Sequence, residues 1–489
     1  MVKKTVKVRF APSPTGYLHI GGLRTALYNY LFVRQNQGSF VLRIEDTDQN
    51  RQVRGSEIKL ITALKNIGLE WEEGPDTTKT LALTEKGQNG PYFQSKRLKI
   101  YQDHAKKLIS SQNAYYCFCQ PDRLDELRKE QQAKNLASKY DGRCRKLTAE
   151  QVKQQLQIYQ KHVIRLKVGT GKVKFNDLIR GVIEIDCNDI DDQILIKSDG
   201  FPTYHLAVVV DDYLMGISHV IRGEEWLPST PKHVLLYQAF GWPLPIFAHL
   251  PLLLNPDKSK LSKRQGDVAV EDFLEKGYLP EALINYVALM GWHPSDNQEI
   301  FSLKELIKCF SLDRIQKSGA VFDLEKLKWF NAYYIKKLPI KKLIDRCQKF
   351  LPKHDLDRKL LTKIINIERG RLTTINQIKE LAETFLKPAD FPPEKLIFNK
   401  SQRQTTLTAL GIALDTLSET KKWVSPEIKK SLVKAVSDHN LTNGDLFWPV
   451  RVALSGQEKS PPPEEIMEII GKSASLSRIE KAIAKLRKS

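Results

Sequence analysis

The chain has 489 residues, of which 41% are hydrophobic, and this length is enough for roughly three to four domains of ordinary size. A formal charge of +20 favours polyanionic partners such as RNA, with a merely soluble basic protein as the alternative. No apolar run approaches the roughly twenty residues of a membrane span, and the N-terminal residues lack the apolar core of a signal peptide. Six irregularly spaced cysteines do not make a disulfide framework. We therefore expect a cytoplasmic protein without a membrane partner.

The first predicted element is a strand at residues 5–10, where Val6, Val8 and Phe10 alternate with polar side chains. From Leu23 onward, apolar residues recur at helical spacing, which predicts a helix. A strand, a short loop and a helix in this order form the arrangement that binds nucleotides in open α/β sheets. A buried histidine in an ordinary βα turn is the simpler alternative.

The loop between these elements has the chemistry of a phosphate site. Pro12 stiffens it, and Gly16, Gly21 and Gly22 let a backbone approach a flat ligand closely. The N-terminus of the following helix offers unpaired N–H groups and the positive end of the helix dipole. His19 at that position can donate a further hydrogen bond to the same anion.

Charged side chains follow further short strands. Glu45 comes directly after a predicted strand at 39–44, and Arg222 ends another at 218–221. Ligands bind beyond the carboxyl ends of strands in open sheets, so we expect Arg9, Arg222 and Glu45 to face one crevice. Two guanidinium groups and one carboxylate suit an amino acid that carries an extra carboxylate.

Three cysteines predict a metal site in the part of the chain after residue 101. Cys117 and Cys119 lie close together, 24 residues separate Cys119 from Cys144, and Tyr140 stands four residues before Cys144. Three thiolates and a phenolate can hold tetrahedral zinc. Residues 145–146 are basic and add no ligand, so three structural cysteines without a metal are the alternative.

The apolar run 206–210 is interpreted as a strand that ends in a turn at Asp211 and Asp212, with magnesium binding by the two carboxylates as the alternative. Downstream, residues 258–264 form a short polar loop with four basic residues. Lysines on such a loop can neutralise charge that develops on a triphosphate.

The C-terminal third has the periodicity of helices. Basic residues cluster between 336 and 349, and Tyr333, Tyr334 and Phe350 lie close to them in the sequence, as on many RNA-binding surfaces. The last helix is predicted to begin at a capping box formed by Ser477 and Glu480.

The strings PSPTGYLHIGG at 12–22 and KLSKR at 260–264 resemble the HIGH and KMSKS signatures of class I aminoacyl-tRNA synthetases, and the longer string is similar to that of bacterial glutamyl-tRNA synthetases. RIEDTD at 43–48, SDGFPTYHLA at 198–207 and HVIRGEEW at 219–226 resemble further segments of that family. The resemblance extends over essentially the whole chain.

This resemblance implies an α/β fold with a Rossmann-like catalytic domain, an inserted domain that binds the tRNA acceptor end, and all-α anticodon-binding domains. In chain order, the implied domains are the first half of the catalytic domain (1–100), the acceptor-binding insertion (101–205), the second half of the catalytic domain (206–255), a KMSKS-loop and stem-contact domain (256–337), and two helical anticodon-binding domains (338–392 and 393–489).

The resemblance also implies site residues. His19, Lys260 and Lys263 would be catalytic. The ATP-binding set would be Pro12, Ser13, Gly16, His19, Gly21, Gly22, Glu225, Trp226, Lys260, Ser262 and Lys263. The glutamate-binding set would be Arg9, Ala11, Ser13, Glu45, Tyr204 and Arg222. Some relatives carry asparagine where this chain has Val208, which removes one polar contact to the substrate.

The implied reaction is ATP- and Mg-dependent activation of L-glutamate, followed by transfer to tRNA(Glu), by a monomer with one structural zinc. Whether tRNA(Gln) is also charged depends, in the family, on a residue that falls within 369–371 here. The alternatives are a glutaminyl-tRNA synthetase, which has β-barrel C-terminal domains, a truncated paralogue that glutamylates a tRNA base, and an inactive RNA-binding paralogue.

Overall fold

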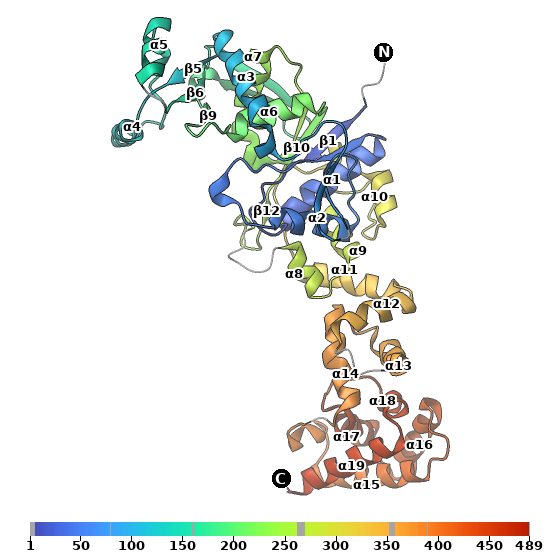
Figure 1. Ribbon diagram of the computed structural model, residues 1–489. Coiled ribbons are helices and arrows are strands. Elements are labelled where there is room, and N and C mark those ends of the chain that lie inside the picture. The colour runs from blue at the N-terminus through green and yellow to red at the C-terminus, as the bar shows by residue number, and fades with distance from the viewer. Residues whose placement is uncertain are drawn as a thin grey trace. The chain divides into compact units, whose positions relative to one another are not determined.

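The chain folds into two compact units. The computed structural model describes residues 5–78, 80–158, 161–261, 269–351, 357–388 and 390–488. The first unit comprises Met1–Glu275 and Pro280–Leu327, and the second comprises Lys276–Leu279 and Lys328–Ser489. Both are coloured along the chain in Figure 1. The finer division into six domains stays a prediction.

Parallel strands form the centre of the first unit. β1 (Lys7–Phe10) pairs with β2 (Ser39–Leu42), and β10 (His219–Gly223) pairs with β11 (Ile246–Leu250). The N–H of Ser218 donates to the Lys7 carbonyl at 2.9 Å, which places β1 beside β10. Helix α1 (Ile20–Gln35) joins β1 to β2 and packs on both strands. The predicted strand, loop and helix are therefore confirmed.

Helices cover this sheet because the chain supplies apolar faces at helical spacing. They include α2 (Ser56–Ile67), α3 (Leu98–Ser110), α6 (Tyr204–Leu214) and α7 (Thr230–Phe240). The prediction of a strand at 206–210 was wrong, because these residues form the middle of α6. All residues from Leu206 to Asp212 are buried, and a continuous apolar run does not distinguish a buried helix from a strand.

The insertion into the first unit is built on a small antiparallel sheet. Its strands are β5 (Ala114–Cys117), β6 (Val163–Leu166) and β9 (Ile194–Ile196), and its helices are α4 (Pro121–Ala133) and α5 (Ala149–Ile158). A hairpin of β7 (Lys172–Asp177) and β8 (Gly181–Asp186) leads back to the central sheet, where β7 pairs with β11.

The remaining elements of the first unit lie between and after these parts. They are the hairpin β3 (Gly74–Thr77) and β4 (Leu83–Lys86), the pair β12 (Leu253–Leu254) and β13 (Ala320–Val321), and helices α8 (Val270–Glu275), α9 (Pro280–Ala288) and α10 (Leu303–Cys309). Helix α11 (Leu324–Lys337) follows β13.

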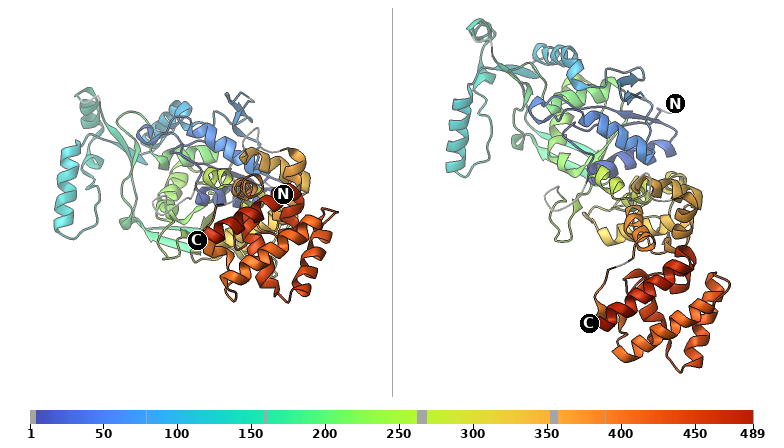
Figure 2. Two further views of the ribbon diagram at one scale, coloured as in Figure 1. Left: turned by 90° about the horizontal axis from the view of Figure 1, so that it is seen from below. Right: turned by 60° about the horizontal axis from the view of Figure 1, so that its bottom comes forward.

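All regular secondary structure among the described residues of the second unit is helical. Its helices after α11 are α12 (Ile340–Cys347), α13 (Arg358–Glu368), α14 (Ile378–Leu386), α15 (Arg403–Glu419), α16 (Ser425–Asp438), α17 (Asn443–Ser455), α18 (Pro463–Ile470) and α19 (Lys472–Lys488). Figure 2 shows the C-terminal helices, orange to red, as a bundle. The predicted all-α C-terminal region is confirmed, but the capping box at Ser477 was wrong, since α19 begins at Lys472.

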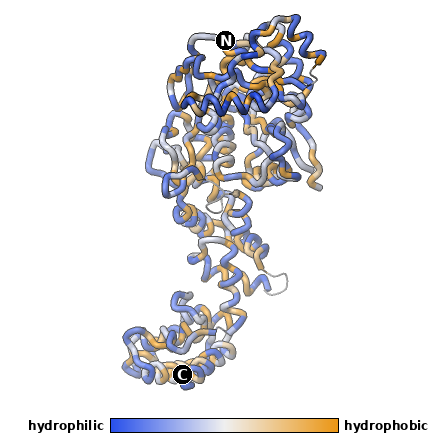
Figure 3. The backbone as a smooth tube through the Cα atoms, turned by 90° about the vertical axis from the view of Figure 1, so that its left-hand side faces the viewer, coloured by the Kyte–Doolittle hydropathy of each residue, from blue (hydrophilic) through white to orange (hydrophobic). Residues whose placement is uncertain are grey.

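Hydrophobic and hydrophilic positions alternate along the helices of both units (Figure 3). Among the described residues, none of the helices combines the length and the apolar composition needed to cross a bilayer.

Candidate active site

The loop after β1 is held against the segment that follows β2. The N–H of Glu45 donates to the Pro12 carbonyl at 3.0 Å, and the hydroxyl of Ser56 donates to the Pro14 carbonyl at 2.7 Å. His19 is the N-cap of α1, and its Nδ1 accepts the N–H of Gly21 at 2.9 Å. Because Nδ1 accepts, the proton of the neutral ring is on Nε2.

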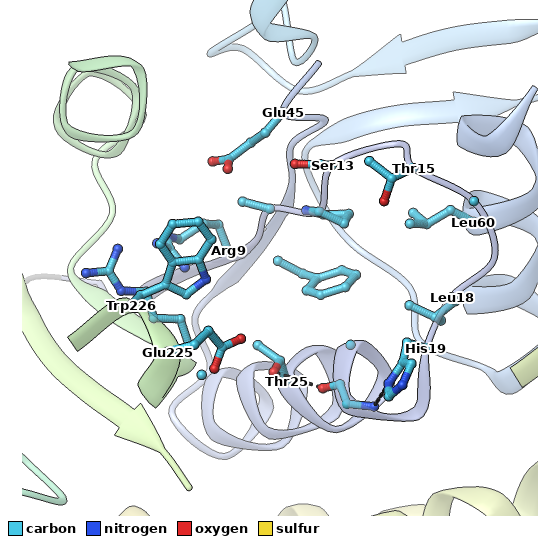
Figure 4. A pocket seen from close by; sticks show the side chains of 18 of the residues that line it. Arg9, Ser13, Thr15, Leu18, His19, Thr25, Glu45, Leu60, Glu225 and Trp226 are labelled. Carbon is cyan, nitrogen blue, oxygen red and sulfur yellow. Dashed lines mark hydrogen bonds between the residues drawn. The ribbon is translucent and has the colours of Figure 1, made fainter. Parts of the chain in front are cut away.

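A cavity of about 300 Å³ lies beyond the ends of β1, β2 and β10 (Figure 4). All residues of the predicted glutamate set line it, namely Arg9, Ala11, Ser13, Glu45, Tyr204 and Arg222. Eight residues of the predicted ATP set also line it, namely Pro12, Ser13, Gly16, His19, Gly21, Gly22, Glu225 and Trp226. The structure therefore brings together residues that are more than 200 positions apart in the sequence.

A second cavity of about 380 Å³ shares one wall with the first. His19, Gly21, Gly22 and Glu225 line both cavities, and the exposed Lys260 lines the second. Ser262 and Lys263 lie outside the described residues. The start of α1 thus separates two adjoining spaces, each of a size that suits a small ligand.

Buried ion pairs lie beneath the first cavity. Arg9 Nε donates to Asp212 at 3.1 Å, and Arg43 donates to Asp212 at 2.8 Å and to Glu45 at 3.0 Å. Arg9 was predicted to contact glutamate, and in the structure its Nε pairs with Asp212, 203 positions away. Burial raises the pKa of Glu45, although Arg43 and Arg9 oppose this shift.

The two aspartates that follow Val210 belong to these ion pairs. Arg97 Nε donates to Asp211 at 2.7 Å, and the hydroxyl of Tyr101 donates to the same carboxylate at 2.8 Å. Burial acts to raise the pKa of Asp212, but Arg9 and Arg43 outweigh it and lower that pKa. Both carboxylates are therefore buried and paired with arginines, whereas the sequence had predicted an end-of-strand turn.

Arg222 is buried and has only neutral acceptors among the described residues. Nε donates to His249 Nε2 at 3.1 Å, Nη1 donates to the Tyr204 hydroxyl at 3.0 Å, and Nη2 donates to the Thr230 hydroxyl at 2.9 Å. The rings of Tyr204 and Trp226 lie 4.1 Å apart. Trp226, which was predicted to lie on the ATP side, therefore packs on a residue of the predicted glutamate set.

Val208 lies one helical turn after Tyr204 in α6. It is 2% exposed and is absent from the residues that line the cavity. Val208 is thus packed in the core and contributes no polar group to the cavity.

The predicted metal ligands of the insertion come together. The three thiol sulfurs of Cys117, Cys119 and Cys144 lie within 4.8 Å of one another, with 3.6 Å between the last two. The Tyr140 hydroxyl lies 3.5 Å from the sulfur of Cys117 and 3.4 Å from that of Cys119. Tetrahedral zinc with bonds of about 2.3 Å to sulfur and 2.0 Å to oxygen requires separations of about 3.5–3.8 Å, so the donor set fits.

The pKa values of two thiols in this cluster shift in opposite directions. A hydrogen bond with Cys144 lowers the pKa of Cys117, and the same bond raises that of Cys144. The guanidinium of Arg165 lies 4.1 Å above the Tyr140 ring. Arg145 donates instead to the Val168 carbonyl at 2.8 Å, as expected for a residue that is not a ligand.

Sequence reasoning missed several residues of the site. Thr15, Leu18, Thr25 and Leu60 line the first cavity, and Arg24 lines the second. Thr25 stands one helical turn after Gly21, so helical spacing from the motif indicates its position. His249 and Thr230, which accept hydrogen bonds from Arg222, carry no comparable signal, because they come from separate elements.

The chain matches known families over most of its length. Residues 5–329 match the family "tRNA synthetases class I (E and Q), catalytic domain", and residues 342–483 match "Anticodon binding domain". A glutamate–tRNA ligase of Alkaliphilus metalliredigens is 46% identical over 98% of this chain and 98% of its own length. One of Clostridioides difficile is 47% identical over 97% of this chain and 98% of its own length.

Solved structures give the same result. The glutamate tRNA ligase of Elizabethkingia meningosepticum, in complex with its amino acid, is 38% identical, with a TM-score of 0.87, 99% of this chain covered and 100% of the other. That of Elizabethkingia anophelis is 39% identical, with a TM-score of 0.86 and coverage of 98% and 100%. With this site and these relatives along its full length, the chain belongs to the glutamate–tRNA ligases of the class I aminoacyl-tRNA synthetase family.

Proposed function

We propose that the protein joins L-glutamate to tRNA(Glu) in two steps. In the first, the α-carboxylate of glutamate attacks the α-phosphorus of ATP, which gives glutamyl-adenylate and releases pyrophosphate. In the second, the glutamyl group passes to the terminal ribose of the tRNA. The observation that carries this proposal is the wall shared by the two cavities, since Arg222 lies in one and the start of α1 lines both.

Glutamate is assigned to the cavity that contains Arg222. The guanidinium and the Tyr204 hydroxyl bind the side-chain carboxylate, and the hydroxyl can donate because its oxygen already accepts from Arg222. Glu45 binds the α-ammonium group. Arg9, together with Ala11 and Ser13, completes the set around the α-carboxylate. The reacting carboxylate then points toward the shared wall.

ATP is assigned to the second cavity and the shared wall. The amides at the start of α1, among them those of Gly21 and Gly22, and the positive end of the helix dipole favour the phosphates. Nε2–H of His19 donates to the phosphate that is attacked. Pro12, Gly16, Glu225 and Trp226 complete the described part of the set.

The loop at 260–264 is assigned to the departing pyrophosphate. Lys260 and Lys263 neutralise charge as the bond to the α-phosphorus breaks, and Ser262 binds the same phosphates. ATP enters as its magnesium complex, in which the cation reduces repulsion among the phosphates. No protein nucleophile is required, because catalysis consists of positioning and charge stabilisation.

One structural zinc is assigned to the insertion. Cys117, Cys119, Cys144 and Tyr140 would hold it, and the metal would join β5 to the segment before α5 without entering the reaction. The insertion itself is proposed to bind the acceptor end of the tRNA.

The second unit is proposed to bind the anticodon arm. Lys336, Lys337, Lys341, Lys342 and Lys349 are exposed, as an RNA-binding surface requires. Arg371 pairs with Glu368 at 3.1 Å, whereas Arg369 donates to the Leu338 carbonyl at 2.5 Å. We propose that the protein is a monomer in the cytoplasm. It charges either tRNA(Glu) alone or both tRNA(Glu) and tRNA(Gln).

The test is exchange of pyrophosphate into ATP in the presence of tRNA, with glutamate and, as the control, glutamine. We expect exchange with glutamate and none with glutamine, and we expect Arg222→Ala to abolish it. Charging of purified tRNA(Glu) and tRNA(Gln) then separates strict from relaxed tRNA choice. Absence of exchange under every condition would favour an inactive RNA-binding protein, and unchanged activity in Arg222→Ala would disprove the assigned pocket.

A further inference from the structure

Arg222 differs from the other buried arginines beside the site. Arg9, Arg43 and Arg97 each pair with a carboxylate at 3.1 Å or less. Within the described residues, Arg222 has no carboxylate within 4 Å, although it is only 5% exposed. A buried guanidinium without an anion is costly unless neutral groups accept its N–H donors. The acceptors around Arg222 therefore determine whether it can remain charged, without an anion, until a ligand binds.

Two of these acceptors are histidine rings that meet the guanidinium from different sides. Nε of Arg222 donates to His249 Nε2 at 3.1 Å, and Nη2 lies 3.2 Å from His233 Nδ1. A guanidinium has donors only, so each ring must be unprotonated at the nitrogen that faces it. The geometry thus fixes one neutral tautomer for each ring.

A second contact of each ring agrees with that tautomer. Nδ1 of His249 lies 2.6 Å from Asp177 Oδ2, and Nε2 of His233 lies 3.1 Å from His205 Nδ1. The first ring therefore donates from Nδ1 to a carboxylate, and the second donates from Nε2 to another imidazole. Oδ1 of Asp177 also accepts the N–H of Ile179 at 3.0 Å, so the carboxylate itself is held in place.

The elements that carry these groups are rigidly connected. Arg222 and His249 are direct neighbours in the parallel pair β10–β11, and Asp177 ends β7, which pairs with β11. His233 belongs to α7 and His205 to α6. Secondary structure thus fixes the position of each acceptor, as precise placement of a buried cation demands.

The electrostatic environment keeps both rings neutral. Burial lowers the pKa of His233 well below its ordinary value and, despite the opposing effect of Asp177, also lowers that of His249. Burial lowers the pKa of His205 to about 4. The charged and titratable groups that face the three rings are Asp177 of β7, Arg222 of β10, Arg9 of β1, Lys232 of α7, Tyr204 of α6 and the rings themselves.

We infer that His233 and His249 are positioning residues, which hold Arg222 as an uncompensated cation for the side-chain carboxylate of the amino acid. This inference rests on the proposed function and deepens it. The two rings do not touch the substrate. They occupy N–H donors of the guanidinium without neutralising it. Tyr204 and Thr230 accept two further N–H groups, so the charge and the one remaining donor, on Nη1, are left for the ligand.

The test compares variants that keep the acceptor with variants that remove it. In His249→Gln the amide oxygen can take the place of Nε2, and in His233→Asn it can take the place of Nδ1. In His249→Leu and His233→Leu no acceptor remains. We expect each leucine variant to raise the KM for glutamate about 10- to 100-fold, as the loss of a buried acceptor implies. The KM for ATP should stay unchanged, and each amide variant should restore most of the affinity.

The control is His104→Leu, which removes a half-buried histidine whose Nδ1 bonds the Ile100 carbonyl away from both cavities. Equal glutamate KM values in the leucine, amide and control variants would overturn the inference. So would a parallel rise of both KM values, which would indicate a general structural role. Failure of the proposed function is distinguishable, because the wild-type protein itself would then show no glutamate-dependent exchange.

A measurement on the wild-type protein covers the case in which the leucine variants do not fold. Nitrogen-15 labelling of histidine reports the tautomer of each ring, and the amide variants assign the signals. We expect His249 to be protonated on Nδ1 alone and His233 on Nε2 alone at neutral pH. The opposite tautomer, or a doubly protonated ring, at either position would overturn the inference.

Discussion

Removal of Arg43 tests whether the ion pairs beneath the first cavity stabilise the catalytic unit. This side chain is fully buried and bonds Asp212 at 2.8 Å and Glu45 at 3.0 Å, with Asp211 at 3.7 Å. In Arg43→Met, Asp212 keeps Arg9 and Asp211 keeps Arg97. Glu45 loses its ion-pair partner, so one carboxylate in three is left uncompensated.

The expected loss in the free energy of unfolding follows from this one unpaired carboxylate. Removal of one partner of a buried ion pair costs about 3–5 kcal/mol, whereas a surface pair contributes about 0–1 kcal/mol. The matched control is therefore Arg34→Met, which removes a partly exposed arginine that bonds Glu72 at 2.7 Å. A second variant, Arg43→Met with Glu45→Gln, restores equal numbers of the two charges. It should recover about half or more of the lost free energy.

The assay is hydrogen–deuterium exchange of the most protected amides of β1 and α1, because the two units need not unfold together. A cost of about 3–5 kcal/mol accelerates exchange on the order of a hundred- to several-thousand-fold. The pKa of Glu45 is raised by burial, and loss of Arg43 raises it further. Protonation then relieves the unpaired charge, so the deficit should shrink as the pH falls.

The ion pairs do not stabilise the fold if Arg43→Met is no less stable than Arg34→Met. If the added Glu45→Gln change makes Arg43→Met less stable, the cost comes from lost packing and not from unbalanced charge.

Three further changes test other parts of the site. His19→Asn should keep the N-cap acceptor of α1 but lose the Nε2–H donor, so stability is retained and kcat for pyrophosphate exchange falls about 10²- to 10³-fold, whereas His19→Ala should also lose about 1 kcal/mol of stability. Gly223→Ala places a methyl group against the flexible carboxylate of Glu225, so stability should change little while the KM for ATP rises. Cys144→Ser should abolish bound zinc in elemental analysis, whereas Cys309→Ser, outside the cluster, should not.

Each of these three predictions has an outcome that would contradict it. Equal activity of His19→Asn and the wild type would remove the imidazole from the reaction. An unchanged KM in Gly223→Ala would show that the Glu225 carboxylate does not face the nucleotide. A folded wild-type protein that contains no metal would end the zinc assignment.

Motif residues were predictable because they are close in sequence and stand at the ends of elements. His19 and the glycines at 21 and 22 form one turn, so their shared cavity follows from a strand, a loop and a helix. Glu45 and Arg222 were found by the same rule about strand ends. Here local pattern and tertiary position agree.

Long-range pairing was not predictable in the same way. Nothing near Arg9 indicates that Asp212 is its partner, and nothing near Arg222 indicates His249. The helix at 204–214 was missed because both of its faces are buried, which removes the polar positions that would reveal its period. The start of α19 was missed although Gly471, with φ of 83°, ends α18 immediately before it. The glycine, and not the pair Ser477 and Glu480, marks this boundary.

The ion pairs beneath the first cavity also constrain how the sequence can diverge. Three guanidinium groups, from Arg9, Arg43 and Arg97, face three carboxylates, from Glu45, Asp211 and Asp212. A lineage that loses one member keeps an uncompensated charge at a buried position until a member of opposite charge is also lost. We therefore expect substitutions at these six positions to occur in matched pairs among homologues, so that covariation between them records the balance.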